Sequence, residues 1–424
     1  MVAPTIIPRA EHPISRRDID PDALKVLYRL KEGGFVAYLV GGGVRDLLLG
    51  RQPKDFDVGT SAHPYQVKRL FRNCWIIGRR FRLAHVKFGP KIIEVATFRR
   101  HVPPSDGVDS GAADAEDGGR DTFGGRDLLI HRDNTFGTPE EDAFRRDFTV
   151  NALFYDIATF SIIDYVGGLR DLREGIIRAI GDPEERFLED PVRMLRAVAF
   201  AERLDFRLDP PVEDAIRLLR AEIARSAPAR LMEEYYKILR TGSSGRVFQA
   251  LARVGLLGPV APALQEAADS PTLATSLERL DAHRRLFAAT PDAFTNPVLL
   301  GSLLVPLGFS VESGHSSREP GGEAWLGLLP VARRDLERLY QLLALQRRLR
   351  DPNLSPRAAR ALLSRGAFAD ALAWLEIHGS DPGAVGRWRA LIEDLRSHET
   401  LPAPPAFIPV RRRRRRSRRS PVKS

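Results

Sequence analysis

The chain has 424 residues, 43% of them hydrophobic, which is enough for two or three domains with sizeable cores. Its formal net charge is +10, but the last fourteen residues hold eight arginines and Lys423 without any acid, so the charge mainly describes the C-terminal tail. A single cysteine, Cys74, excludes an internal disulfide and a cysteine-based metal site, and its apolar neighbours predict a buried thiol. No apolar run approaches membrane-spanning length and no signal-peptide core is present, which predicts a soluble, cytoplasmic protein without a membrane partner.

The first part of the chain predicts an α+β head over residues 21–182, preceded by a flexible N-terminal arm over residues 1–20. A helix is predicted over residues 21–31, with Asp20 as its N-cap, and a second helix over residues 64–72. Strand-like runs are predicted at residues 35–40, 55–58, 75–77, 84–88, 92–97, 152–156, 161–165 and 176–180. Because strands outnumber helices here, we expect a mixed or antiparallel sheet rather than a long alternating parallel one.

Residues 101–127 are rich in glycine and aspartate and almost free of apolar residues, which predicts a mobile acidic loop, either an inert insertion or a functional lid. After Pro183 the pattern is helical, and we expect a helical neck over residues 183–255 and a helical body over residues 256–400. Residues 401–424 are predicted to be a Pro-rich linker and a disordered arginine-rich tail, because like charges repel and nothing apolar accompanies them.

Two neighbouring motifs indicate phosphoryl-transfer chemistry. Three glycines, Gly41 to Gly43, lie between a predicted strand and a short helix, where the backbone N–H groups can approach a triphosphate closely. Asp55 and Asp57 follow, and on a strand residues two apart point to the same face. Two adjacent carboxylates require a compensating cation, and hard divalent ions such as Mg²⁺ or Mn²⁺ accept such oxygen ligands.

Each motif alone has a simpler interpretation. Asp-x-Asp also occurs as two solvated turn aspartates, or in a metal-dependent glycosyltransferase, which would have no use for the glycine loop. The glycines are not a dinucleotide fingerprint, because Asp46 occupies the position where a third glycine or alanine is needed. The combination of a phosphate loop with paired carboxylates is more specific than either part.

The motif GGGVRD followed by KDFDV resembles the head domain of the class II tRNA nucleotidyltransferase and poly(A) polymerase family. Further segments match that family in order: GRRFRLAHV at residues 78–86, IIEVATFR at 92–99, EEDAFRRDFTVNAL at 140–153, DYVGGLRDL at 164–172 and EDPVRMLRAVAF at 189–200. The resemblance implies a polymerase-beta-like nucleotidyltransferase head. It also implies template-independent nucleotide addition to RNA by a two-metal mechanism that releases pyrophosphate.

The resemblance implies the residues that bind metal. Asp55 and Asp57 match the family's metal ligands and are predicted to be catalytic. For a third carboxylate, Asp147 in the RRDFT segment is the first candidate, with an N-cap or a local ion pair as its structural alternative. Glu94 is the second candidate, because its strand position would face the core and a buried glutamate needs a partner.

Nucleotide binding is implied for a second group of residues. Gly42, Gly43 and Arg45 are expected to hold the triphosphate, with Arg146 as a further phosphate contact. Structural salt bridges are the alternative for both arginines.

Base selection is expected from Asp190 and Arg193, which stand three residues apart and would share a helix face. A carboxylate accepts from an amino group and a guanidinium donates to a ring nitrogen, which suits adenine and cytosine but not uracil and guanine. Arg196 would extend this face. Family members often have a further arginine where this chain has Ala199, so that contact is in doubt.

Three features favour poly(A) synthesis over CCA addition to tRNA. Residues 71–99 look more like the bacterial poly(A) polymerase branch, the basic tail resembles that branch, and the helical half contains no His-Asp pair of a phosphohydrolase. The expected activity is transfer of AMP from ATP to RNA 3′ ends, promoting mRNA decay, with RNA-decay proteins as further partners. A CCA-adding or A-adding enzyme and an inactive RNA-binding relative are the alternatives.

The tail has a predicted role of its own, since arginines neutralise RNA phosphates irrespective of sequence. A purely solubilising tail is the alternative. The predicted RNA-binding residues are Arg411, Arg412, Arg413, Arg414, Arg415, Arg416, Arg418 and Arg419.

Overall fold

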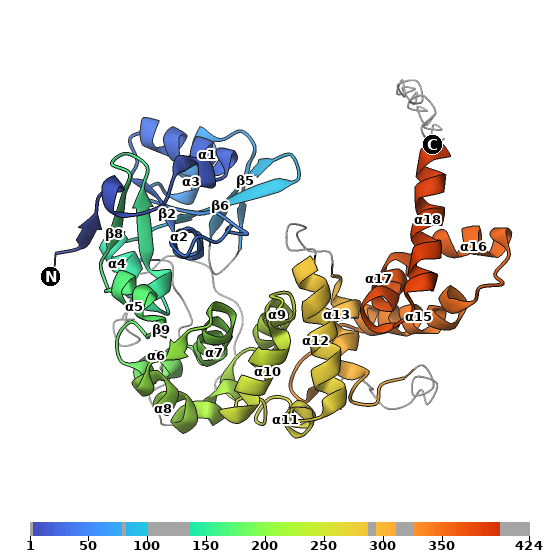
Figure 1. The fold of residues 1–424 in the computed structure, drawn as a ribbon. Coiled ribbons are helices and arrows are strands. Elements are labelled where there is room, and N and C mark those ends of the chain that lie inside the picture. Colours follow the sequence, from blue (N-terminus) through green and yellow to red (C-terminus); the bar gives the residue numbers. More distant parts are fainter. Residues whose placement is uncertain (1–2, 79–81, 101–134, 287–293, 311–325, 399–424) are drawn as a thin grey trace, which may run out of the picture.

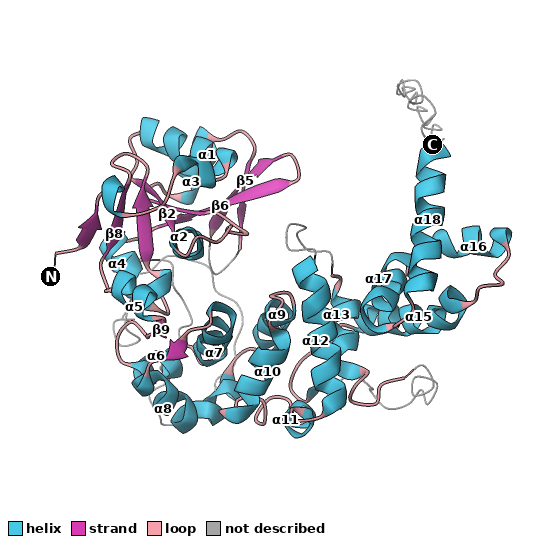
Figure 2. Cartoon of the chain, in the orientation of Figure 1, coloured by secondary structure: helices cyan, strands magenta, loops and turns pink. Residues whose placement is uncertain are grey.

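The computed structural model describes residues 3–78, 82–100, 135–286, 294–310 and 326–398 (Figure 1). The predicted acidic loop at 101–127 and the predicted linker and arginine-rich tail at 401–424 lie outside these described residues. Strands are gathered in the head, and the rest of the described chain is almost entirely helical (Figure 2).

The head is built on one mixed sheet of eight strands in the order β1-β8-β7-β2-β3-β6-β5-β4. The strands are β1 Thr5–Ile7, β2 Ala37–Val40, β3 Asp57–Thr60, β4 Cys74–Ile77, β5 Leu83–Phe88, β6 Lys91–Thr97, β7 Leu153–Asp156 and β8 Ser161–Asp164. Only β3 and β6 run parallel; the other neighbours are antiparallel. This arrangement confirms the predicted α+β head with a mixed sheet.

Helices cover both faces of this sheet. Figure 1 shows α1 (Pro21–Glu32) and α3 (Pro64–Leu70) above it and α2 (Gly42–Leu48) below it, towards the neck. The predicted cap of α1 is confirmed, because the Asp20 carboxylate accepts from two backbone amides of the first turn. Cys74 is buried under α3, as its apolar neighbours predicted.

The N-terminal residues form part of the head, so the predicted flexible arm is wrong for the described residues. Strand β1 pairs with β8 and extends the sheet by one strand. Behind it, His12 bonds through Nε2 to the carbonyl of Phe160, and the side chain of Ile14 is buried. The sequence could not show this pairing, because the partner strand lies far along the chain, with Thr5 paired to Asp164.

The neck wraps below the head as a run of short helices. Its elements are α6 Pro183–Glu189, α7 Val192–Leu204, β10 Arg207–Leu208, α8 Pro210–Leu219, α9 Pro228–Leu239 and α10 Ser244–Arg253. The head contributes α4 Pro139–Phe144, α5 Gly168–Glu174 and β9 Ile176–Ile177 before them. The expectation of no strands after Pro183 is wrong in one detail, because β10 pairs in parallel with β9.

The body continues as helices packed side by side. They are α11 Pro262–Ala267, α12 Pro271–Leu286, α13 Asn296–Leu304, α15 Arg333–Arg350, α16 Pro356–Leu363, α17 Phe368–His378 and α18 Pro382–His398. Gly301 allows the close packing of α13, because a Cβ there would lie 2.6 Å from the Trp374 ring. The predicted division between neck and body at residue 255 stays a prediction.

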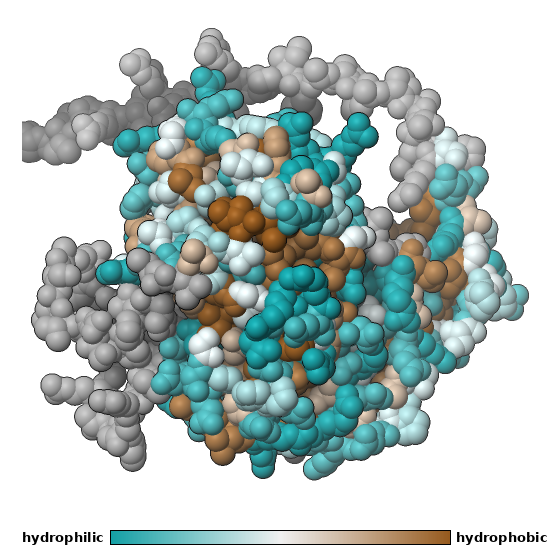
Figure 3. All heavy atoms as spheres, turned by 60° about the vertical axis from the view of Figure 1, so that its left-hand side comes forward, coloured by the Kyte–Doolittle hydropathy of each residue, from teal (hydrophilic) through white to brown (hydrophobic). Residues whose placement is uncertain are grey.

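The surface carries both hydrophilic and apolar side chains. On the face turned forward in Figure 3, hydrophilic residues surround an apolar area near the centre. Within the described residues, no helix combines the length and apolarity that crossing a bilayer requires.

The packing of the N-terminal segment can be tested by truncating a buried side chain. We expect Ile14→Ala to lower the free energy of unfolding of the head by about 2–5 kcal/mol. The Ile14 side chain is only 1% exposed, so its truncation removes buried apolar contacts and leaves a cavity. Ile6→Ala is the control, since Ile6 is largely exposed on β1. The measurement is the urea midpoint of the first transition by circular dichroism, and equal midpoints for both variants would restore the flexible arm.

Candidate active site

A cavity of about 1440 Å³ lies where the head meets the neck. One wall comes from the head and includes Asp55, Asp57 and Glu94. The facing wall comes from the neck helices α7 and α9 and includes Arg196 and Arg203. Carboxylates and guanidinium groups therefore face each other across one hollow, which suits a substrate that brings both cations and phosphates.

The paired aspartates lie in the segment that enters β3. Only Asp57 belongs to the strand; Asp55 precedes it, so the expectation that both lie within a strand is wrong. The alternation expected of them is present, because Phe56 between them is buried while both aspartates are exposed in the cavity. Gly43 of α2 packs close to this segment, since a Cβ there would lie 3.3 Å from the Asp55 carbonyl oxygen.

Glu94 joins the aspartates from the neighbouring strand β6, which runs parallel to β3. Its side chain is half exposed and lines the cavity, so the expectation that it faces the core is wrong. The pKa of Asp57 is raised to about 6, first because the side chain is confined in the cavity and then because Glu94 and Asp55 carry like charges. The positive charge of Arg146 acts in the opposite direction. The three carboxylates thus interact before any cation is bound.

The donor set fits a hard divalent ion. Carboxylate oxygens are the ligands that Mg²⁺ prefers, and such sites are commonly completed by water and substrate phosphates. In the described part of the chain, no three His, Cys, Asp or Glu side chains already converge as a finished metal site. Asp55 and Asp57, with Glu94 beside them, would hold the metal together with a bound substrate.

Asp147 is engaged elsewhere, which contradicts its expected place as the third metal ligand. Its Oδ2 atom accepts from Nε of Arg196 at 2.8 Å, and Oδ1 accepts from the Phe148 amide and the Asn151 amide group. Burial acts to raise the pKa of Asp147, but Arg196 and these hydrogen bonds outweigh it and keep the pKa low. Among the described residues that line the cavity, Glu94 is present and Asp147 is not.

Arg45 is a structural residue in this conformation and not an open phosphate contact. Its side chain is only 2% exposed, it donates to Asp46 at 2.7 and 2.9 Å, and it bonds to the Asn151 side chain. This is the salt-bridge alternative foreseen from the sequence. Gly42 and Gly43 form the first turn of α2, where N–H groups have no intrahelical partner, and their triphosphate role stays a prediction.

Arg146 is held near the aspartates by a buried carboxylate. Its guanidinium donates to Asp142 at 2.9 and 3.1 Å and to the Asn151 carbonyl at 3.1 Å. Burial opposes ionisation of Asp142, but the charges of Arg146 and Arg145 prevail and keep its pKa below the usual range. Because Arg146 also lowers the pKa of Asp57, its charge reaches the cavity, and its phosphate role stays a prediction.

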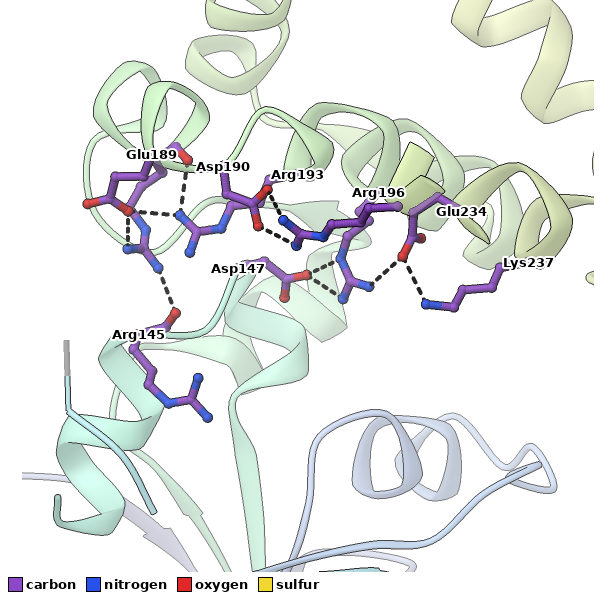
Figure 4. A network of polar contacts seen from close by, with 10 residues as sticks. Arg145, Asp147, Glu189, Asp190, Arg193, Arg196, Glu234 and Lys237 are labelled. Atoms are coloured by element: carbon purple, nitrogen blue, oxygen red, sulfur yellow. Dashed lines mark hydrogen bonds and ion pairs between the residues drawn. The ribbon is translucent and has the colours of Figure 1, made fainter. Parts of the chain in front are cut away.

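The expected base-selecting pair is split between two partners (Figure 4). Asp190 is the C-cap of α6 and lies outside α7, so the expectation of one shared helix face is wrong. Both its carboxylate oxygens accept from Arg230 of α9, at 2.6 and 2.7 Å. Arg193 is buried and donates to Glu189 at 2.9 Å. Their role in base selection stays a prediction.

Arg196 links the head to the neck. Besides Asp147, its guanidinium lies 3.9 Å from Glu234 of α9, which in turn accepts from Lys237 (Figure 4). Asp147 is the main reason for the raised pKa of Arg196. The side chain lines the cavity, and Asp147 and Glu234 hold it in place there.

Two cavity residues escaped the sequence reasoning. Phe200 lies between guanidinium groups, with the Cζ atoms of Arg45, Arg196 and Arg203 5.1 to 5.4 Å from its ring centroid. Burial and repulsion from Arg45 lower the pKa of Arg203 to about 10. The spacing of positions 196, 200 and 203 on one helix was the available signal. Ala199 also lines the cavity, where it leaves a small side chain beside Phe200.

Comparison with known proteins matches both the head and the neck. Residues 37–178 match the family described as "Poly A polymerase head domain", and residues 205–268 match "Probable RNA and SrmB- binding site of polymerase A". Poly(A) polymerase I of Salmonella typhi is 54% identical over 260 residues, which are 61% of this chain and 54% of that protein. Poly(A) polymerase I of Escherichia coli O157:H7 is 51% identical over 271 residues, 63% and 56% of the two chains. The match thus spans about half the length of these relatives.

CCA-adding enzymes are more distant in sequence. The CCA-adding enzyme of Lactobacillus helveticus is 37% identical over 272 residues, 61% of this chain and 62% of that protein. The crystal structure of the Bacillus stearothermophilus CCA-adding enzyme in complex with CTP superposes with a TM-score of 0.59 at 27% identity, covering 89% of this chain and 84% of that one.

The carboxylate cluster predicts a pH-dependent cation affinity. Below pH 6 the Asp57 carboxyl takes up a proton, so a divalent ion must displace it, and we expect Mn²⁺ affinity to fall by roughly tenfold per pH unit there. Asp57→Asn should bind Mn²⁺ weakly at every pH, while Asp205→Asn, on an exposed turn, should behave as the parent. Titration calorimetry between pH 5 and 8 measures this, and a parent affinity that does not change with pH would contradict the assignment.

Proposed function

We propose that the chain belongs to the family of the poly A polymerase head domain, whose model matches residues 37–178, and that the protein is a template-independent RNA nucleotidyltransferase. The reaction we propose transfers AMP from ATP to RNA 3′ ends and releases pyrophosphate. The observation that carries the proposal is the cavity in which Asp55 and Asp57 face the basic neck helices. A module that only binds RNA has no use for clustered carboxylates beside phosphate.

The proposed mechanism assigns the two walls of the cavity different tasks. Bound divalent metal, Mg²⁺ or Mn²⁺, would supply charge neutralisation of the triphosphate and activation of the attacking 3′ hydroxyl. Asp55 and Asp57 would hold the metal, and their mutual repulsion favours its binding. Arg196 and Arg203 on the facing wall would orient the phosphates of nucleotide and RNA. Asp147 acts through Arg196 as a positioning residue.

Two lines of support favour adenylation over CCA addition. The poly(A) polymerase I relatives are 46–54% identical to this chain, against 36–37% for the CCA-adding enzymes. The arginine-rich tail at 411–419 also suits an enzyme that acts on many RNA ends, although it lies outside the described residues. CCA addition stays the second candidate, because the similarity to the CCA-adding enzyme structure extends over 89% of the chain.

RNA is the proposed macromolecular partner. The family description matched by residues 205–268 names an RNA-binding site, and this segment includes α9 and α10, which continue from the cavity wall. We propose RNA 3′ ends, including those of mRNA, as substrates and RNA-decay proteins as associated partners. These partners are proposals for the whole protein, because the match covers only part of each relative.

The proposed activity is tested by supplying nucleotides separately. The purified protein is incubated with a labelled generic RNA and with a tRNA lacking its CCA end, in ATP or in CTP. We expect long tails from ATP on the generic RNA and no extension by Asp57→Asn, which loses a metal ligand. Addition that stops within three nucleotides on the tRNA would favour the CCA-adding alternative, and no addition by the parent would contradict the proposal.

Base selection is tested at Arg230. In this conformation its two nitrogens fix the Asp190 carboxylate, so removing them should leave that acceptor poorly oriented. We expect Arg230→Ala to lower the ratio of kcat/KM for ATP to kcat/KM for UTP by roughly tenfold. This is the effect of losing one charge-assisted hydrogen bond between Asp190 and the base, worth about 1.5 kcal/mol. Arg225→Ala is the matched control, because Arg225 pairs with a different carboxylate, that of Glu222, at 3.0 Å. An unchanged ratio would show that Asp190 does not depend on Arg230.

A further inference from the structure

The open edge of the head sheet carries exposed apolar and basic side chains that the proposed mechanism does not use. We name this the edge surface and define it as Tyr65 and Lys68 of α3, Trp75 and Ile77 of β4, and Arg82. Tyr65 is 59% exposed, Trp75 53% and Ile77 50%. A cavity of about 510 Å³ lies among Tyr65, Lys68, Trp75 and Arg82. Large apolar side chains gathered at an exposed hollow indicate a binding surface.

The charge of this region has one sign. Between Val58 and Ile93 the sequence contains no aspartate or glutamate, while it contains eight lysines and arginines. They are Lys68, Arg69, Arg72, Arg79, Arg80, Arg82, Lys87 and Lys91. Lys91 is paired with Asp20 and Asp22, whereas the segment itself contains no acid to neutralise its other basic residues. Such an excess of positive charge attracts a polyanion.

The edge surface is continuous with the catalytic cavity through the sheet. In the strand register Trp75 pairs with His85, and His85 pairs with Glu94. Directly paired residues point to the same face, so Trp75 lies on the face that carries Glu94 and, one strand further, Asp57. Three strand spacings place the backbone at Trp75 roughly 14 Å from that of Asp57.

The two cavities also meet along the chain. Arg82 lines the edge cavity, and the next residue, Leu83, lines the catalytic cavity together with His85. A strand that leaves the catalytic cavity across β5 therefore reaches Trp75 without crossing the core. Figure 1 shows β5 and β6 at the end of the head away from the N-terminus.

We propose that the edge surface binds single-stranded RNA just upstream of the 3′ end that lies in the catalytic cavity. Aromatic rings that stack on bases, with cations that follow the phosphates, bind single strands of any sequence. Such binding suits an enzyme that acts on many RNA ends. The inference rests on the proposed function, because it assumes that an RNA 3′ end enters the cavity.

The test compares a short and a longer RNA. The parent, the double variant Tyr65→Ala/Trp75→Ala and the conservative variant Trp75→Phe are titrated with a trinucleotide and with an RNA of about 15 nucleotides, by fluorescence anisotropy. We expect the double variant to lose roughly tenfold to a hundredfold in affinity for the longer RNA, from the loss of stacking. Trp75→Phe should retain most of it. AMP addition to the trinucleotide should be unchanged in both variants, because their side chains lie outside the catalytic cavity.

A charge variant gives an independent measure. Lys68→Glu should flatten the salt dependence for the longer RNA by about 0.7 or more in log–log slope, as one phosphate contact is lost. The control combines Leu328→Ala with Arg333→Glu, two exposed positions in the body, and should leave both quantities unchanged. Thermal unfolding checks that each variant remains folded.

The outcomes separate this inference from the proposed function. A double variant that binds the longer RNA as tightly as the parent overturns the edge surface as an RNA site, while AMP addition by the parent still stands. A parent that extends neither RNA overturns the proposed function instead. Quenching of tryptophan fluorescence by the longer RNA in the parent, absent in Trp75→Phe, would support stacking on Trp75 directly.

Discussion

Repulsion among Asp55, Asp57 and Glu94 is the constraint on which the site depends. Three carboxylates in one hollow are unfavourable without a cation; confinement of the Asp57 side chain raises its pKa, and the charges of Glu94 and Asp55 raise it further. The parallel pairing of β3 with β6 brings them together, because it sets Glu94 beside the start of β3. The close approach of Gly43 to the Asp55 backbone holds that segment in place. The fold therefore maintains an arrangement that only a bound cation makes favourable.

The neck manages its positive charge in a different way. Arg196 is paired with Asp147, whereas Arg203 lies against the ring of Phe200, which also contacts Arg196 and, from the head, Arg45. An aromatic ring between guanidinium groups stabilises cations without cancelling their charge, so the cavity stays attractive to phosphate. The head wall of the cavity is therefore negatively charged and the neck wall positively charged. A substrate with bound cations and phosphates can neutralise both.

Substrate choice and RNA path depend on surfaces that adjoin this cavity. Asp190 is held by Arg230 from a different helix, so the orientation of one carboxylate depends on how α9 packs against α7. On the head, the row from Glu94 through His85 to Trp75 connects the catalytic cavity to the sheet edge. Nucleotide transfer in the cavity, base selection at Asp190 and RNA binding at the edge surface would then take place on adjoining surfaces of the protein.

The sequence alone determined the local features. Periodicity predicted α1, α3 and a helical chain after Pro183, and Asp20 marked the start of α1. Glycines with alternating aspartates marked the segment that lines the cavity. These features depend on neighbouring residues, which a single sequence displays. Only the tertiary structure decided the partners of the long charged side chains. Asp147 pairs with Arg196, which is 49 residues further along the chain, and Asp190 pairs with Arg230, 40 residues further along. Glu94, and not Asp147, lies beside the paired aspartates in the cavity. The pairing of β1 with β8 was decided in the same way. Contacts between distant segments depend on how elements pack, and that information is not contained in any local pattern.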